Sequence, residues 1–235
     1  MSGPLYRWPA AAKFGRVVPK SKFYENATIS PTMRDKFVSE VQRITWAYKL
    51  SDETIHLRGD TAVPEIQIFA IDAKDDDVSD GMLTAIDKSI PFPIIFEISH
   101  GFGEQISLRM TAAHKQLGAG IPRISAYFTT DWQRVDVTRA PLPPALDLPG
   151  LYTSLLTPIL PIALRSGEDM SVAAGRMDQS RKLERDIAVL EKKLRTEPQL
   201  NRKVELRRHL RDRTAALLAL TEPTAPKTEE FPWRS

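Results

Sequence analysis

The chain has 235 residues, of which 42% are hydrophobic, so it can bury one sizeable core but not two full-sized domains. It contains no cysteine, which excludes disulfides, thiolate metal ligands and a cysteine nucleophile and favours a cytoplasmic protein stabilised by packing. The formal net charge is only +3, and charges or prolines interrupt every apolar stretch before it reaches membrane-spanning length. We therefore expect a cytoplasmic protein without membrane association.

The first elements that the pattern predicts are an N-terminal arm and an amphipathic helix. Residues 5–26 mix rings with basic residues, and the rings are Tyr6, Trp8, Phe14 and Phe23. These rings can stack nucleic-acid bases, although packing against the helix that follows explains them as well. A helix is predicted over residues 31–50, because Ser30 offers an N-cap and apolar residues recur at spacings of four, three and four. The recurring residues are Phe37, Val41, Ile44 and Tyr48.

The middle of the chain alternates between apolar runs and turn signals, which predicts a sheet. A short strand is expected at residues 54–57, and residues 65–71 are apolar on both faces, as in a central strand. The next predicted elements are a helix at 81–89 and strands at 94–99, 105–112 and 121–129. This order predicts an α+β fold, in which a mixed β-sheet carries its helices mainly on one face.

The C-terminal third predicts an antiparallel helical hairpin. Two ladders of apolar residues are separated by a turn that contains Pro198, and they consist of Leu183, Ile187, Leu190 and Leu194, then Leu206, Leu210, Leu217 and Leu220. We therefore divide the chain into an α+β domain at residues 1–138 and a Pro/Leu-rich connection with a short helix at 139–170. A coiled-coil-like hairpin at 171–222 and a disordered tail at 223–235 follow.

Five segments of the chain carry a family resemblance: residues 19–25, 44–50, 65–69, 85–94 and 201–206. In this order they resemble the successive blocks of a bacterial family catalogued as domain of unknown function 4391. Its members are often encoded near helicase and DNA-methyltransferase genes of restriction or phage-defence systems. The resemblance implies a DNA-related complex with a helicase or methyltransferase partner, and it carries over no catalytic residue.

Basic residues cluster on the second helix of the expected hairpin, within about three helical turns. They are Arg202, Lys203, Arg207, Arg208 and Arg211. Guanidinium groups bind phosphates through paired hydrogen bonds, so this row is the candidate nucleic-acid-binding site, for DNA or RNA. A solvated helix surface explains the same charges, because the first helix of the hairpin carries both signs mixed.

The strongest enzymatic interpretation is a divergent Mg²⁺-dependent nuclease of the restriction-endonuclease type. Such enzymes combine carboxylates with an acid-x-Lys pair on a strand, and Asp60, Glu65 and the pair Asp72 and Lys74 supply these residue types. The match is poor, because the acid-x-Lys pattern expects a lysine two residues after Glu65 and Gln67 occupies that position. Asp72 is followed by further aspartates, which is typical of a solvated turn.

Other catalytic or metal-binding patterns are missing from the sequence. The histidines His56, His100, His114 and His209 lack ligand spacing, so we expect no metal and no cofactor. We expect a non-enzymatic accessory subunit of a bacterial DNA restriction or phage-defence system that binds a helicase or methyltransferase partner and nucleic acid. Two alternatives stay open: a nuclease that uses Glu65, Asp72 and Lys74, and a homodimeric scaffold paired through the hairpin.

Overall fold

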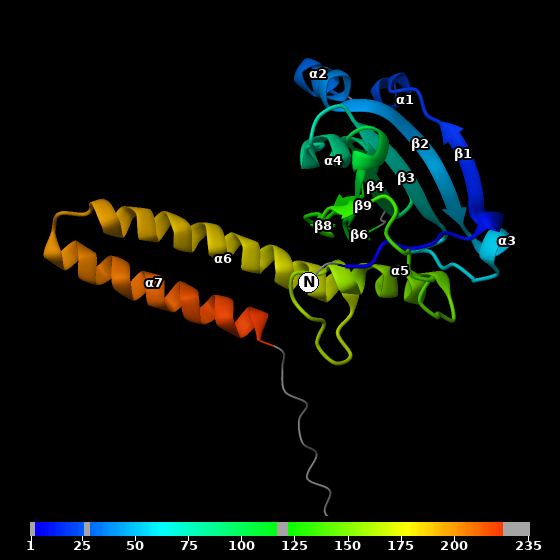
Figure 1. Cartoon of the computed structure of the whole chain (residues 1–235). Coiled ribbons are helices and arrows are strands. Elements are labelled where there is room, and N and C mark those ends of the chain that lie inside the picture. The colour runs from blue at the N-terminus through cyan, green and yellow to red at the C-terminus, as the bar shows by residue number, and fades with distance from the viewer. Residues whose placement is uncertain (1–2, 26–28, 117–121, 223–235) are drawn as a thin grey trace, which may run out of the picture. The chain divides into compact units, whose positions relative to one another are not determined.

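The structure is a computed structural model that describes residues 3–25, 29–116 and 122–222. The chain forms two compact units, Met1–Leu160 and Pro161–Ser235, and Figure 1 follows it from the N-terminal strands to the helical hairpin. The division falls within the segment 139–170 that was expected to connect two domains. The predicted tail, 223–235, lies outside the described residues.

One mixed sheet organises the first unit. Within the described residues it has seven strands in the order β1-β2-β3-β4-β5-β8, with β9 also paired to β5. The strands are β1 (Lys13–Val17), β2 (Val41–Leu50), β3 (Ile66–Ala73), β4 (Ile94–His100), β5 (Ser107–Ala112), β8 (Phe128–Thr129) and β9 (Gln133–Arg134). β3 and β4 are parallel, whereas the other pairs in this sheet are antiparallel. β6 (Lys115–Gln116) and β7 (Arg123–Ile124) form a separate two-stranded sheet. The predicted α+β class with a mixed sheet is confirmed.

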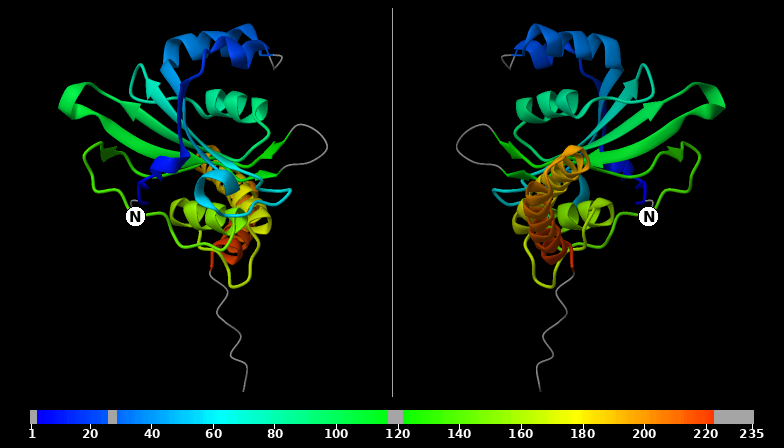
Figure 2. Two further views of the ribbon diagram at one scale, coloured as in Figure 1. Left: turned by 90° about the vertical axis from the view of Figure 1, so that its right-hand side faces the viewer. Right: turned by 90° about the vertical axis from the view of Figure 1, so that its left-hand side faces the viewer.

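Three helices share a core with one face of the sheet. They are α1 (Ser21–Glu25), α2 (Pro31–Glu40) and α4 (Asp80–Ser89). Their buried Phe23, Phe37 and Met82 belong to one apolar cluster with Phe69 of β3 and Phe96 of β4. α5 (Leu148–Leu156) lies on the other side of the sheet from α4 (Figure 2). The remaining short elements are α3 (Asp52–Ile55) and the 3₁₀ turns η1 (Ala10–Ala12), η2 (Gly103–Gln105) and η3 (Thr157–Ile159).

The helix predicted over residues 31–50 is wrong beyond Glu40, because the chain continues as β2. Phe37, Val41 and Ile44 are all buried in one core, but they reach it from a helix and from a strand, so their helical spacing is coincidental. Residues 41–50 are rich in β-branched and aromatic types, which fit a strand. Pairing with β3 along almost the whole of β2 stabilises that conformation.

Two further predictions differ from the structure. Residues 54–57 were predicted as a strand, but Thr54 and Ile55 are the last residues of α3 and no strand follows at 56–57. The Thr54 hydroxyl accepts a hydrogen bond from the Ser51 backbone N–H at 2.9 Å. The strand predicted at 121–129 begins outside the described residues, and its remainder is divided between β7 and β8, which pair with different strands. The elements predicted at 65–71, 81–89, 94–99 and 105–112 are confirmed to within two residues at their ends.

The edge strand β1 is irregular. All of its side chains are exposed, and its pairing with β2 shifts between Lys13 and Arg16. Gly15 lies inside this shift at φ +68°, in the left-handed region that favours glycine. A bulge flanked by two charges is a common way to prevent an edge strand from pairing with another chain.

A buried carboxylate fastens the N-terminal arm to the middle of the sheet. Glu97 of β4 accepts hydrogen bonds from Trp8 Nε1 at 2.8 Å and from Arg139 Nη1 at 2.6 Å. Arg139 also donates to the carbonyl oxygen of Tyr6 at 2.8 Å. One side chain of β4 therefore joins two segments that are about 130 residues apart in sequence.

We expect Glu97→Gln to lower the free energy of unfolding of the first unit by about 2 kcal/mol. The variant removes the charge that Arg139 faces, but Arg139 is 28% exposed and water can solvate it in part. Urea unfolding followed by tryptophan fluorescence measures the loss. Arg134→Gln, which breaks an exposed ion pair with Asp136, is the control and should leave the midpoint unchanged. Equal midpoints for both variants would contradict the expectation.

The second unit contains the predicted helical hairpin, which is confirmed. α6 (Met170–Thr196) and α7 (Leu200–Thr221) run side by side (Figure 1). Leu183 of α6 is buried, while Leu206 and Leu210 of α7 are half-buried. No helix in the described ranges combines the length and the apolar content that are needed to cross a bilayer.

Arginines fasten the last turn of α7 at the base of the hairpin. Arg176 Nη1 donates to the carbonyl oxygen of Leu220 at 2.7 Å, and Arg165 Nη2 donates to that of Ala219 at 2.7 Å. Arg176 also binds the Glu168 carboxylate through Nε at 2.8 Å and Nη2 at 2.7 Å, and both side chains are buried. Cationic groups are favourable here because the final carbonyls of a helix lack partners within it and carry partial negative charge.

Candidate functional site

Three of the predicted binding residues form one exposed basic face on α7. Arg207, Arg208 and Arg211 are exposed, and their positions span about 100° of the helix circumference. Within the described residues, none of the three makes an ion pair. We call Arg207, Arg208 and Arg211 the α7 basic face.

The structure places the other two predicted residues differently. Arg202, in the first turn of α7, lies 3.5 Å from a carboxylate oxygen of Glu197, which belongs to the turn between the two helices. Lys203 is half-buried and precedes Leu206 by three residues, so it lies on the side of α7 that faces α6. Neither residue belongs to the α7 basic face.

The net charge of the hairpin is more positive than the net charge of the whole chain. Residues 170–221 contain thirteen Lys or Arg and seven Asp or Glu, a net charge of +6 against +3 for all 235 residues. The remaining residues therefore have a net charge of −3. A polyanion is attracted to the hairpin by this field in addition to any direct contact.

A second group of polar side chains lies where the parallel strands β3 and β4 end. A cavity of about 510 Å³ is lined there by Arg43, Asp72, Ser99 and His100 among others. Arg43 Nε donates a hydrogen bond to Asp72 Oδ2 at 2.8 Å, and Arg43 Nη2 lies 2.7 Å from the same oxygen. The Ser99 hydroxyl donates to Asp72 Oδ1 at 2.9 Å. Ligands of open α/β sheets often bind at this position, but both oxygens of Asp72 already accept hydrogen bonds. Asp72 therefore orders the end of the sheet.

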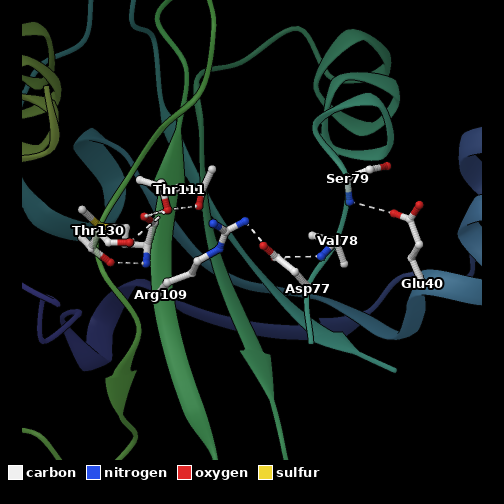
Figure 3. A network of polar contacts seen from close by, with 9 residues as sticks. Glu40, Asp77, Val78, Ser79, Arg109, Thr111 and Thr130 are labelled. Atoms are coloured by element: carbon white, nitrogen blue, oxygen red, sulfur yellow. Dashed lines mark hydrogen bonds and ion pairs between the residues drawn. The ribbon is translucent and has the colours of Figure 1, made fainter. Parts of the chain in front are cut away.

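The acidic turn after β3 is also held by specific contacts, as Figure 3 shows. Arg109 of β5 donates to Asp77 Oδ1 at 2.7 Å, and its guanidinium carbon lies 5.0 Å from the centre of the Trp132 ring. Glu40, the last residue of α2, accepts a hydrogen bond from the Ser79 backbone N–H at 2.7 Å, just before α4 begins. The turn that was expected to be merely solvated is fixed to α2 and to β5.

The residues of the nuclease interpretation do not converge. Glu65 precedes β3 and Asp72 is near its other end, and the six residues of strand between them place them about 23 Å apart. Glu65 pairs with Lys49 at 3.2 Å, and Asp60 accepts hydrogen bonds from the backbone of its own turn. Among the described residues, no group of three or more His, Cys, Asp or Glu side chains is placed to hold a metal ion.

Sequence reasoning missed a buried ionic network beside α4. Lys115 of β6 forms an ion pair with Asp87 of α4, and both side chains are fully buried. The Lys115 ammonium also donates to the carbonyl oxygens of Asp87 at 2.8 Å, Ile90 at 3.0 Å and Phe92 at 2.6 Å. The Tyr127 hydroxyl donates to Asp87 Oδ2 at 2.9 Å. The partners are 28 and 40 residues apart, so no local pattern indicated this network.

Burial shifts the ionisation of these groups. Loss of hydration raises the pKa of Asp87 and lowers the pKa of Lys115, while their mutual attraction opposes both shifts. Burial also raises the pKa of Tyr127, and the neighbouring Asp87 charge adds to this effect. A network that is closed to solvent and satisfied internally is structural, so it offers no group to a substrate.

Comparison with known proteins identifies one family. The family model for DUF4391, a domain of unknown function, matches residues 7–217, which is most of the chain and includes the sheet as well as the hairpin. No curated protein and no solved structure matches the chain. The chain belongs to the DUF4391 family, as the resemblance of its five sequence segments implies.

Proposed function

We propose that this chain is a non-enzymatic accessory subunit of a bacterial DNA restriction or phage-defence system, which binds nucleic acid and a helicase- or methyltransferase-type partner. The nucleic-acid part rests on one observation: the α7 basic face is exposed and makes no ion pair within the described residues. Free guanidinium groups bind phosphate oxygens bidentately and without regard to base sequence. The type of machine and partner follows from the family resemblance.

Binding to a labelled 20-base-pair DNA duplex, measured by fluorescence anisotropy at several salt concentrations, tests the nucleic-acid part. Three phosphate contacts predict that the affinity of the unmodified chain falls about 40-fold between 50 and 200 mM salt. We expect the triple variant Arg207→Glu, Arg208→Glu, Arg211→Glu to bind at least about 100-fold more weakly at low salt, because three attractive contacts become repulsive. Its remaining binding should depend little on salt.

A matched variant controls for total charge. Lys182→Glu, Arg185→Glu and Lys192→Glu change the net charge by the same amount at exposed positions of α6. We expect a loss of less than about fivefold, because exposed charges beyond about 10 Å are screened. An equal loss in both triple variants, or an unchanged salt dependence in the α7 variant, would remove the α7 basic face as the binding site.

Joint expression tests the partner part of the proposal. The chain is produced together with any helicase and any methyltransferase that its neighbouring genes encode, and the mixture is separated by size-exclusion chromatography. Elution of the chain with one of these enzymes supports the accessory role. Separate elution from both enzymes rejects it.

A homodimeric scaffold is the second candidate, and exposed apolar residues on α7 favour it. Leu200, Val204 and Leu218 are each more than half exposed, and their positions lie within about 60° of those of Arg207 and Arg211. Light scattering decides this point. A dimeric mass that Leu218→Glu reduces to a monomer supports the scaffold, whereas a monomer at all concentrations excludes it.

A further inference from the structure

An aromatic cavity is lined by residues of α1, β2 and β3, by Val18 after β1, and by the chain at and after the end of α4. Its volume is about 290 Å³, and its lining includes the rings of Phe23, Trp46, Phe69 and Phe92. The Trp46 ring stacks on Phe69 with centroids 6.1 Å apart and planes inclined by 9°, and the Phe14 ring lies 4.1 Å from Trp46. The rings therefore continue from the core to the edge strand, where Phe14 is 38% exposed.

Basic side chains surround this aromatic cavity. Lys22 lines it, and Lys88 is exposed near the end of α4, where the next residues line it too. Arg16 pairs with Trp46 in the β1–β2 register, and its guanidinium carbon lies 5.2 Å from the centre of the Phe14 ring. Among the described residues that line the cavity, none is acidic. The surroundings attract an anion, while the rings accept a flat apolar group.

Glu65 is a carboxylate that contacts the lining, and its charge is neutralised. Glu65 accepts a hydrogen bond from the lining residue Gln67, and it pairs with Lys49 at 3.2 Å. The Trp46 Nε1 group already donates to the carbonyl oxygen of Tyr48 at 3.1 Å, so the tryptophan presents its apolar surface to the cavity. The paired Glu65 therefore opposes the approach of an anionic ligand less than a free carboxylate would.

We propose that the aromatic cavity binds a base of single-stranded nucleic acid, while the basic residues around it contact the flanking phosphates. Stacking on aromatic rings combined with a cationic surface is how single strands are bound without sequence preference. The inference rests on the proposed function in one respect, that the ligand is nucleic acid, and it narrows that ligand to single strands. Bases of an intact duplex are stacked inside it and do not reach the cavity.

An acidic peptide with one aromatic side chain has a similar charge and shape. The exposed Phe14 ring beside the cavity favours nucleic acid. Successive bases of one strand are all flat, so a base next to the one in the cavity can stack on Phe14. Successive side chains of an extended peptide point to opposite sides, so only every second one would face this row of rings.

Anisotropy with labelled ten-nucleotide oligo(dT) and with the 20-base-pair duplex tests the inference on the full chain. We expect Phe14→Ala to weaken oligo(dT) binding about tenfold through lost stacking and to leave duplex binding unchanged. Lys22→Glu should weaken oligo(dT) binding and lower its salt dependence by one phosphate contact, a change of about 0.7 in the logarithmic slope. Phe102→Ala, which removes a ring that is 82% exposed in the β4–β5 connection, should change neither affinity.

The outcomes separate the inference from the proposed function. If Phe14→Ala and Lys22→Glu both leave oligo(dT) binding unchanged while the α7 triple variant loses the duplex, the inference fails and the proposed function stands. If the duplex does not bind but oligo(dT) binds and Phe14→Ala weakens it, the α7 interface fails and the cavity assignment stands. Tighter binding of a ten-residue peptide with glutamates around one tryptophan, weakened by Phe14→Ala, would assign the cavity to a protein ligand and overturn the inference.

Discussion

Lys115→Met is expected to lower the free energy of unfolding of the Met1–Leu160 unit by about 3–5 kcal/mol, the largest effect of any single substitution considered. Methionine fills the space of the lysine stem, but it leaves the fully buried Asp87 carboxylate with the Tyr127 hydroxyl as its remaining donor on Oδ2. It also removes the donor from the carbonyl oxygens of Ile90 and Phe92. An uncompensated buried charge and unsatisfied carbonyl groups act in the same direction.

A double variant separates the cost of an orphaned charge from that of lost packing. In Asp87→Leu with Lys115→Met neither charge is buried alone, so we expect recovery of a substantial part of the loss. Lys88→Met, one position along the same helix but exposed, is the control and should have little effect. Urea unfolding followed by tryptophan fluorescence measures the stability of this unit. If Lys115→Met lowered the free energy of unfolding by less than about 1 kcal/mol, the ion pair between Lys115 and Asp87 would contribute little to stability.

Arg176→Met is expected to destabilise the base of the hairpin by about 3 kcal/mol. The substitution removes the charged partner of the buried Glu168 carboxylate, which still accepts a hydrogen bond from the Arg165 backbone N–H at 2.9 Å. It also frees the carbonyl oxygens of Ala163 and Leu220. Hydrogen exchange measured by mass spectrometry on the full chain should show faster exchange in the last turns of α7 and at the start of α6. Arg185→Met, at an exposed position of α6, should leave exchange unchanged, and equal protection in both variants would contradict the expected role of Arg176.

The contact between Arg176 and Glu168 predicts that the stability of the hairpin depends on pH. The Arg176 guanidinium holds the pKa of Glu168 below its ordinary value of about 4.3. A depressed pKa in the folded state stabilises the hairpin above that ordinary value, and this contribution is lost as the pH falls through the folded-state pKa. We expect hydrogen-exchange protection of α7 to decline on acidification below about pH 4.3, and to decline less in Glu168→Gln. Parallel declines in both proteins would exclude Glu168 as the titrating group.

Local patterns in the sequence predicted the elements that depend on local chemistry. The strands around Phe69 and Phe96 are long apolar runs bounded by turn residues, and the hairpin repeats its leucines at helical spacing. The helix over residues 31–50 failed at Val41, where spacing alone fits both a helix and a strand. Pairing with β3 decides between the two, and the partner of Val41 in that pairing, Ala73, lies 32 residues away.

The charged contacts within each unit depend on the fold, so the sequence showed only part of them. Lys115 and Asp87 meet because β6 reaches α4, and no spacing between them indicates it. Arg176 shares a face of α6 with Ala173 and Ser180, and the structure shows that this face is buried, so that a charge there requires a partner. On α7, the leucine spacing predicts which side of the helix faces α6, so it also predicted that Arg207, Arg208 and Arg211 are exposed. The pairing of Arg202 with Glu197 depends on the conformation of the turn, which the spacing does not give.

The bulge in β1 has a consequence for behaviour at high protein concentration. A regular edge strand with free N–H and C=O groups acts as a template on which a second copy adds a strand, and such additions can propagate into insoluble aggregates. Gly15, at φ +68°, interrupts that template between Lys13 and Arg16. Gly15 thus allows Phe14 of β1 to stay exposed to a ligand, while it prevents β1 from pairing with the edge strand of a second copy of the chain.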